Sequence, residues 1–572
     1  MKIVCICNLK VLLAALIVLS ATSAHAQINP TQWKEDLDFL EQTIKTKHLD
    51  SFENITEEEF TKEVTQLRSR IDTLEDFEVS LEMVRIVGTI GWGHTRLSLP
   101  VNGDHLGFYQ GHSGTSSDSR ISSFSVLPIR FFLFKDGLFV QSASEDYKNY
   151  IGYKVIAFGP VSVTEVLDRV RPYMSVENES AFRLQAPIRL SIIELLYTLR
   201  LTNSLKRISL TLENEGISKE ITVEPIGFDQ NPKWFDIHSL KSITKPLWLT
   251  GTHSGMWDLV DSKHFWDSEK QYYWSTFLED GKIQYVKINH LDDPYGGIPV
   301  AGFMKQTIDS AIYNNADKIV IDLRHNMGGS NDVNRSILLA LARWEKSKYY
   351  GNVFAIIGRH TYSAAIMLAQ MLEENIQVAF IGEETGGKPA NIGDSRKFRL
   401  PNSQLTLRVS TLRHHDWVRT DRPSIYIHYP IPFYSQEYFT GIDPVLNWIR
   451  SNPIQGLSDV LFDVYVNAGF RSMRNILNKY LSDPDTYTVD FEDAALKVAD
   501  YILNIKNNNQ RAQWMYQYIL WYYPESRNSI IGYILSSHRL EDSSAAQEGI
   551  EYLEKLYPND PEIARLQRLL KD

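Results

Sequence analysis

Cysteine is nearly absent from this chain of 572 residues. The only two cysteines, Cys5 and Cys7, lie within the first 26 residues. Those residues are expected to be removed, so the mature chain offers no disulfide, no thiol nucleophile and no cysteine-based metal site. It also lacks a cysteine after the cleavage point that could carry a lipid anchor.

Long apolar runs are scarce as well. The apolar run at residues 11–19 is too short to span a bilayer, and no later stretch reaches the required length. Lys2 and Lys10 precede this run and an A-x-A pattern ends at Ala26, which is typical of a secretory signal peptide over residues 1–26. We therefore predict an exported protein, periplasmic or extracellular, without a membrane span.

Basic clusters are also missing. The chain carries 59 Lys and Arg against 70 Asp and Glu, a net charge of −11, and loss of the two signal-peptide lysines makes the mature chain −13. Nucleic-acid binding depends on clustered Lys and Arg, so no nucleic-acid partner is expected. The scattered histidines, including the pair His414-His415, lack zinc-ligand spacing. No metal or other cofactor is therefore expected.

What remains is an ordinary globular composition, with 43% hydrophobic and 12% aromatic residues. The length is too great for one hydrophobic core, and the alternation of helical and strand patterns predicts an α/β multidomain chain. The predicted segments are the signal peptide (1–26), a helical domain (27–98), a β-rich domain (99–270), an α/β core (271–452) and a helical tail (453–572).

Local patterns place elements within these segments. Helices are expected at 30–40, 56–71, 74–90, 161–170 and 187–200, and a hairpin at 207–224. Thr56 and Glu59 have the spacing of a capping box. Segment 227–271 has no pattern that we assign.

Three strands that end in polar loops organise the core. The first leads from Asp317 into a loop with two glycines, the second runs through Ser363 into an apolar helix, and the third is followed by a glycine-rich loop. Ser363 therefore lies where a strand turns into a helix. Free backbone N–H groups and the helix dipole stabilise a developing negative charge at such a point. A helix-capping role is the alternative for a serine at this position.

These residues resemble the motifs of the carboxyl-terminal-processing (tail-specific) serine proteases and their tricorn-core relatives. The motifs are DLR-x-N-x-GG at 322–329, T-x-S-A-A at 361–365 and G-x-x-T-x-G-K at 382–388. In that family the serine of the second motif is the nucleophile, which implies this role for Ser363. The resemblance also implies a crotonase-like βαβ core.

The resemblance leaves two candidates for the general base. Processing proteases place a base lysine 25 residues after the nucleophile, which here is Lys388. A lysine can act as base only where its pKa falls from about 10 toward neutrality. In tricorn-core relatives the base is the His of a D-G-H-T segment, which here is His94, and the ordinary pKa of histidine, about 6.5, already suits the task. The spacing slightly favours Lys388.

Trp92 stands where those relatives carry the Asp of D-G-H-T, so His94 has lost that acid as a supporting partner. An ordinary loop residue is the alternative for His94. For an acid that completes the site, the resemblance suggests Asp421 first and Glu437 second, with solvated loop acids as the alternative.

The resemblance also suggests an oxyanion hole. Its donors would be the backbone amides of Gly328 or Gly329 and of Ala364. Glycine allows the close approach that such a loop requires.

The flanking domains carry two further resemblances. Residues 152–159 resemble a segment of PDZ-like domains, which bind extended peptide tails by strand addition; a plain small β domain is the alternative. Tyr523-Pro524 and Tyr557-Pro558 are 34 residues apart, the period of tetratricopeptide-like helix pairs. We expect this tail either to dock on the core or to bind a protein partner.

Three functional hypotheses follow. The first is a secreted serine endopeptidase that hydrolyses proteins or peptides through an acyl-enzyme, with C-terminal tails as candidate substrates. The second is a catalytically degenerate peptide- or ligand-binding protein on the same fold, favoured by Trp92 and by Ile366, where relatives often carry Glu. The third is a partner scaffold that uses the C-terminal helices.

Overall fold

The computed structural model describes residues 28–570, with gaps at 100–123, 228–271, 280, 295–296, 345–346, 348–351, 390–391, 415–421, 452–456 and 483–490. The expected signal peptide, Asp421 and nearly all of segment 227–271 lie outside the described residues. In the described part of the chain, no helix is both long and apolar enough to cross a bilayer.

Three helices open the described chain, as the sequence predicted: α1 (Pro30–Lys47), α2 (Glu57–Arg70) and α3 (Asp76–Gly88). The capping box at Thr56 is confirmed, because its hydroxyl accepts from the Glu59 N–H while the Glu59 side chain accepts from the Thr56 N–H. Asn29 and Gln32 cap α1 in the same way. These caps fix the helix starts and leave an apolar face of each helix to be buried.

An antiparallel sheet with the strand order β3-β4-β5-β7-β8 follows, and β6 pairs with β5. Its strands are β3 (Ile129–Phe134), β4 (Gly137–Ala143), β5 (Lys154–Phe158), β6 (Val161–Ser162), β7 (Ile208–Asn214) and β8 (Ile217–Val223). Its helices are α4 (Val163–Val170), α5 (Glu179–Arg189) and α6 (Ile193–Thr198). A short pair, β2 (Ser125–Val126) and β9 (Ile226–Gly227), lies beside them.

The expected helix at 187–200 is wrong in its bounds. The Asn178 side chain accepts from the Ala181 N–H, so α5 starts at Glu179 and Pro187 lies inside it. A break after Arg189 then separates α5 from α6. The sequence pattern gave undue weight to Pro187 as a start signal and overlooked the asparagine cap.

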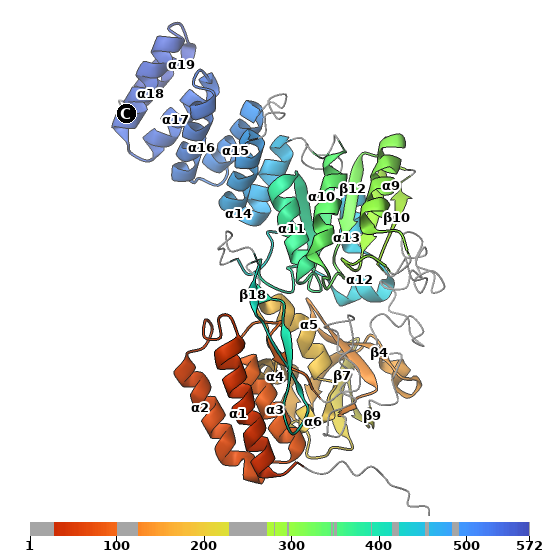
Figure 1. Cartoon of the computed structure of the whole chain (residues 1–572). Helices are drawn as coiled ribbons and strands as arrows, with labels where there is room; N and C mark the ends of the chain where they lie inside the picture. Colours follow the sequence, from red (N-terminus) through yellow and green to blue (C-terminus); the bar gives the residue numbers. More distant parts are fainter. Residues whose placement is uncertain are drawn as a thin grey trace, which may run out of the picture.

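One hydrophobic core joins the N-terminal helices, this sheet and a hairpin from much later in the chain. Leu37, Val140, Leu210 and Leu407 all belong to it. The hairpin consists of β16 (Arg396–Arg399) and β17 (Thr406–Val409), and β17 pairs with β1 (Arg96–Leu97). Figure 1 shows this teal hairpin descending from the upper part of the molecule among the red and yellow elements. This pairing holds the residues just before β1 against the predicted α/β core segment, 271–452. The predicted domain boundaries stay predictions.

The upper part is built on a mainly parallel sheet with the order β10-β11-β12-β13-β14-β19, in which only β10 is antiparallel to its neighbour. The strands are β10 (Tyr273–Leu278), β11 (Ile283–Ile288), β12 (Lys318–Asp322), β13 (Val353–Ile357), β14 (Val378–Gly382) and β19 (Tyr429–Pro430). One face packs against α9 (Val300–Tyr313), α10 (Asn334–Ala342) and α11 (Ala364–Asn375), and the other against α13 (Pro444–Ser451) and α14 (Leu457–Ser482). A short pair, β15 (Ile392–Gly393) and β18 (Leu412–Arg413), and α12 (Ser435–Thr440) complete it. The α/β prediction is confirmed, and the crotonase-like and PDZ-like assignments stay predictions.

The tail continues from α14 as a row of helices at the top left of Figure 1. They are α15 (Phe491–Asn504), α16 (Asn509–Tyr522), α17 (Arg527–Arg539), α18 (Ser543–Leu556) and α19 (Pro561–Leu569). The two tyrosines that are 34 residues apart, Tyr523 and Tyr557, are the C-caps of α16 and α18. The tetratricopeptide-like assignment and the protein partner for this tail stay predictions.

Candidate active site

Ser363 lies at the turn from β13 into α11, as the sequence predicted. It is the residue before the first turn of α11, and its φ of 52° and ψ of −125° are unusual for a residue other than glycine. The backbone before it is fixed by the Tyr362 N–H, which donates to the Asn326 carbonyl at 3.0 Å. Strained backbone at a sharp strand-to-helix turn is a common way of presenting a nucleophile.

His94 is in hydrogen-bond contact with this serine. The distance from His94 Nε2 to Ser363 Oγ is 3.0 Å. Thr95, the next residue, is held by Ser410: the Thr95 hydroxyl lies 3.0 Å from the Ser410 hydroxyl and accepts from the Ser410 N–H at 3.1 Å. His94 is 3% exposed. Burial, followed by the charges of Arg96 and other nearby cations, lowers its pKa to about 3, so the imidazole is neutral at physiological pH.

The other ring nitrogen of His94 contacts Tyr362, the residue immediately before the serine. Tyr362 Oη lies 2.8 Å from His94 Nδ1, and the two rings stack with centroids 4.6 Å apart. The Tyr362 hydroxyl also donates to Glu177 Oε1 at 3.2 Å. His94 thus has a partner at Nδ1 although the family's Asp is replaced by Trp92.

Glu177 is a buried carboxylate that three separate segments contact. Besides Tyr362, the Gly93 N–H donates to its Oε1 and the Lys388 N–H to its Oε2, each at 3.0 Å. Burial raises the pKa of Glu177 above its ordinary value, and these three donors work against that rise.

Sequence reasoning missed both Tyr362 and Glu177. Tyr362 lies inside the T-x-S-A-A motif and could have been considered for its position beside the serine. Glu177 carries no motif and is 186 residues before Ser363 in the chain, so only the fold brings it to the site.

The structure places the Lys388 side chain over Trp92, and its role as the base stays a prediction. Its ammonium lies 5.7 Å from the centroid of the Trp92 ring, and within the described residues no hydrogen bond joins it to Ser363. Its backbone N–H, instead, holds Glu177. The structure therefore brings His94 to Ser363 and leaves the Lys388 side chain over an indole.

Of the predicted oxyanion-hole residues, Gly328 and Ala364 lie beside Ser363. A Cβ on Gly328 would come within 2.9 Å of Ser363 Cβ and 3.0 Å of the Ala364 nitrogen, so only glycine fits here. The Gly328 N–H itself donates to Asn326 Oδ1 at 2.8 Å. Within the described residues, the N–H groups of Gly329 and Ala364 have no acceptor. The oxyanion role of these amides stays a prediction.

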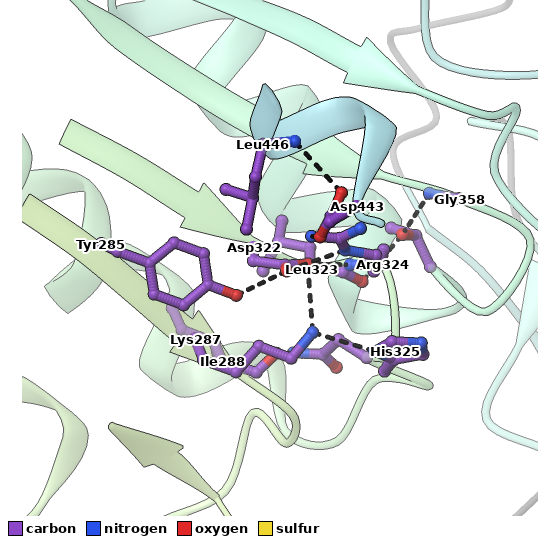
Figure 2. Close-up of polar contacts among 12 residues, drawn as sticks. Tyr285, Lys287, Ile288, Asp322, Leu323, Arg324, His325, Gly358, Asp443 and Leu446 are labelled. Atoms are coloured by element: carbon purple, nitrogen blue, oxygen red, sulfur yellow. Dashed lines mark hydrogen bonds and ion pairs between the residues drawn. The ribbon is translucent and has the colours of Figure 1, made fainter. Parts of the chain in front are cut away.

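A buried ionic network holds the loop that carries these glycines. Figure 2 shows it at the ends of β11 and β12: Asp322 accepts from Tyr285, pairs with Lys287 at 3.1 Å and pairs with Arg324 at 2.8 Å. Arg324 also pairs with Asp443 at the start of α13, at 2.7 Å. Although burial alone would raise it, Arg324 and Lys287 hold the pKa of Asp322 at about 2.

Of the two acids suggested by resemblance, only Glu437 is among the described residues. Asp421 lies outside the described residues. Glu437 is on α12, in the turn before Tyr438 and Phe439, which belong to an aromatic cluster with Phe132 and Phe134. Both assignments stay predictions, and among the described residues the acid linked to His94 is Glu177.

Comparison with known proteins gives distant structural matches. No family model matches the chain, and no curated protein does. The structure of mature CPAF complexed with lactacystin has 14% identity and a TM-score of 0.49, covering 74% of this chain and 97% of that chain. The photosystem II D1 C-terminal processing protease has 12% identity and a TM-score of 0.32, covering 70% and 93%.

The chain is thus distantly similar to a carboxyl-terminal-processing protease. The tricorn protease is also similar, with 12% identity and a TM-score of 0.32, covering 74% of this chain and 36% of that chain. All of these likenesses are distant. The case for a function therefore rests on the atoms around Ser363.

Proposed function

We propose that this chain is a serine peptidase that hydrolyses peptide bonds through an acyl-enzyme on Ser363. The observation that carries the proposal is the 3.0 Å contact between Ser363 Oγ and the Nε2 of a buried, neutral His94. A serine hydroxyl is a weak nucleophile until a base within hydrogen-bond distance takes its proton. His94 meets that requirement and is therefore the base in this proposal.

In the first half-reaction, Ser363 Oγ attacks the scissile carbonyl carbon while its proton passes to His94 Nε2. The carbonyl π pair moves onto oxygen, and the oxyanion accepts hydrogen bonds from the amides of Gly329 and Ala364. The C–N bond then breaks as His94 gives its proton to the leaving amine. In the second half-reaction a water attacks the ester in the same way, which releases the acid and restores the serine.

The wider setting is part of the same proposal. The predicted signal peptide makes the enzyme an exported one, and its substrate is a protein or peptide. The sheet of β3 to β8 is the candidate region for holding a substrate's C-terminal tail, because strand addition is the usual way in which such a domain binds an extended peptide.

Casein hydrolysis by the mature chain tests the proposal. We expect wild type to release peptides and Ser363→Ala to lose at least about 10³-fold in rate, because the nucleophile is gone. Ser543→Ala, an exposed serine at the start of α18, is the matched control and retains the full rate. Equal rates for wild type and Ser363→Ala would refute the peptidase and favour a ligand-binding protein on this fold.

A further inference from the structure

Glu177 is the point where three parts of the site meet. It receives hydrogen bonds from the segment that carries His94, through Gly93, and from the turn that carries the serine, through Tyr362. The third comes from the loop after β14, through Lys388. None of these contacts is needed to attack a carbonyl, so their role must lie in how the site is arranged.

The direction of the hydrogen bonds follows from which groups can donate. The amides of Gly93 and Lys388 only donate, and one of them points at each oxygen of Glu177, so this carboxylate acts as acceptor. The Tyr362 hydroxyl has a single proton, and the charged carboxylate is a stronger acceptor than a neutral imidazole, so we assign that proton to Glu177. An oxygen lone pair of Tyr362 therefore faces His94 Nδ1, which must carry a hydrogen to complete that contact.

This arrangement decides what the other ring nitrogen can do. With its proton on Nδ1, neutral His94 presents a lone pair at Nε2, toward Ser363 Oγ. The opposite tautomer would point an N–H at the serine and could not take its proton. We propose that Glu177 is a positioning residue that fixes the base-competent tautomer of His94 through the Tyr362 hydroxyl; this rests on the function proposed above.

Protonation of Glu177 would reverse the direction of the hydrogen bonds that link Glu177, Tyr362 and His94. A protonated carboxyl donates to the Tyr362 oxygen, the Tyr362 proton turns to Nδ1, and Nε2 then carries the hydrogen. Four charged or titratable groups face this hydrogen-bonded series. Lys388 favours the ionised carboxyl of Glu177, and Arg96, Arg408 and the imidazole of His414 lie around His94.

The pH dependence follows from the two opposite shifts. Burial lowers the pKa of His94 to about 3 and raises that of Glu177 above its ordinary value. As pH falls, Glu177 is thus protonated before His94, and the acid limb of kcat/KM reports the carboxyl. Removing the carboxyl removes that limb, which a purely structural role would not do.

The test uses the full mature chain and the variants Glu177→Gln and Tyr362→Phe, with Glu179→Gln as matched control. Glu179 is an exposed carboxylate two residues further on, paired with Arg171 at the surface. We expect kcat to fall by about 10²-fold or more in the first two variants with KM nearly unchanged, because an imidazole in the wrong tautomer cannot act as base. The acid limb should disappear in Glu177→Gln, and Glu179→Gln should match wild type within twofold.

Nitrogen-15 NMR of labelled histidine gives a second readout that needs no activity. We expect the His94 signals, identified by their loss in His94→Gln, to show hydrogen on Nδ1 in wild type and a changed tautomer in Glu177→Gln. Kinetics within threefold of wild type in both variants with an unchanged acid limb, or hydrogen on Nε2 in wild type, would overturn the proposal. Should Glu177→Gln fail to fold, Tyr362→Phe decides alone, since it keeps the ring stack. Wild type that shows the Nδ1 tautomer but cleaves nothing would support the positioning role and refute the peptidase.

Discussion

Gly93→Ala tests the arrangement around His94 without touching any reacting group. A Cβ at Gly93 would lie 2.4 Å from Tyr362 Oη and 3.2 Å from Glu177 Oε1. Ordinary contact begins near 3.4 Å, so the hydroxyl must withdraw by about 1 Å. The 2.8 Å contact between Tyr362 Oη and His94 Nδ1 would then open to roughly 3.8 Å, beyond hydrogen-bond range.

The consequence is a loss of rate larger than the loss of stability. A displacement of this size within a catalytic constellation lowers rates by about 10²-fold, and overpacking a buried site costs about 1–3 kcal/mol. Steady-state peptidase kinetics and urea unfolding of the same preparation separate the two effects. The control is Gly302→Ala in α9, where the new Cβ meets only Ile298, a side chain that is 42% exposed and able to move. A Gly93→Ala enzyme with kcat within threefold of wild type would refute the reasoning.

Two further predictions concern stability. Asp322→Asn removes the counter-charge of buried Lys287 and Arg324, so we expect the free energy of unfolding in urea to fall by about 3–5 kcal/mol. The control is Asp317→Asn, at the exposed pair with Lys282, which should lower it by less than about 1 kcal/mol. Equal losses in the two variants would contradict the account. His48 is buried, and burial lowers its pKa to about 4. Between pH 6.5 and pH 4 the unfolded chain therefore binds a proton at His48 that the folded chain does not bind. The contribution of His48 to stability is complete above pH 6.5, and the free energy of unfolding falls by roughly 3 kcal/mol as pH falls to 4. Urea unfolding of wild type and His48→Asn at both pH values measures it, and the same pH dependence in the two proteins would contradict it.

The strands and turn that present Ser363 could be predicted from sequence because their signals are local. Apolar runs that end in glycine pairs predicted β12, and the strand-to-helix transition after β13 predicted the position of the serine. The capping box of Thr56 likewise lies within four residues and was found correctly.

The partners of His94 could not be predicted in the same way. The motif spacing favoured the Lys388 side chain, because spacing along the chain says nothing of which way a side chain turns after a glycine-rich loop. In the structure, the Lys388 side chain packs over Trp92, and its backbone N–H donates a hydrogen bond to Glu177. Glu177 itself comes from the segment before α5, whose start the sequence pattern misplaced. Contacts between residues so far apart in the sequence depend on how the folded segments pack against one another.

The pairing of Ser363 with His94 is the claim on which the account depends. Fluorophosphonate labelling of wild type, His94→Ala and Lys388→Ala, followed by peptide mapping, measures it most directly. We predict one adduct, on Ser363, formed at least about 10²-fold more slowly in His94→Ala and less than tenfold more slowly in Lys388→Ala. An adduct on another serine, or a labelling rate that depends on Lys388 and not on His94, would contradict the account.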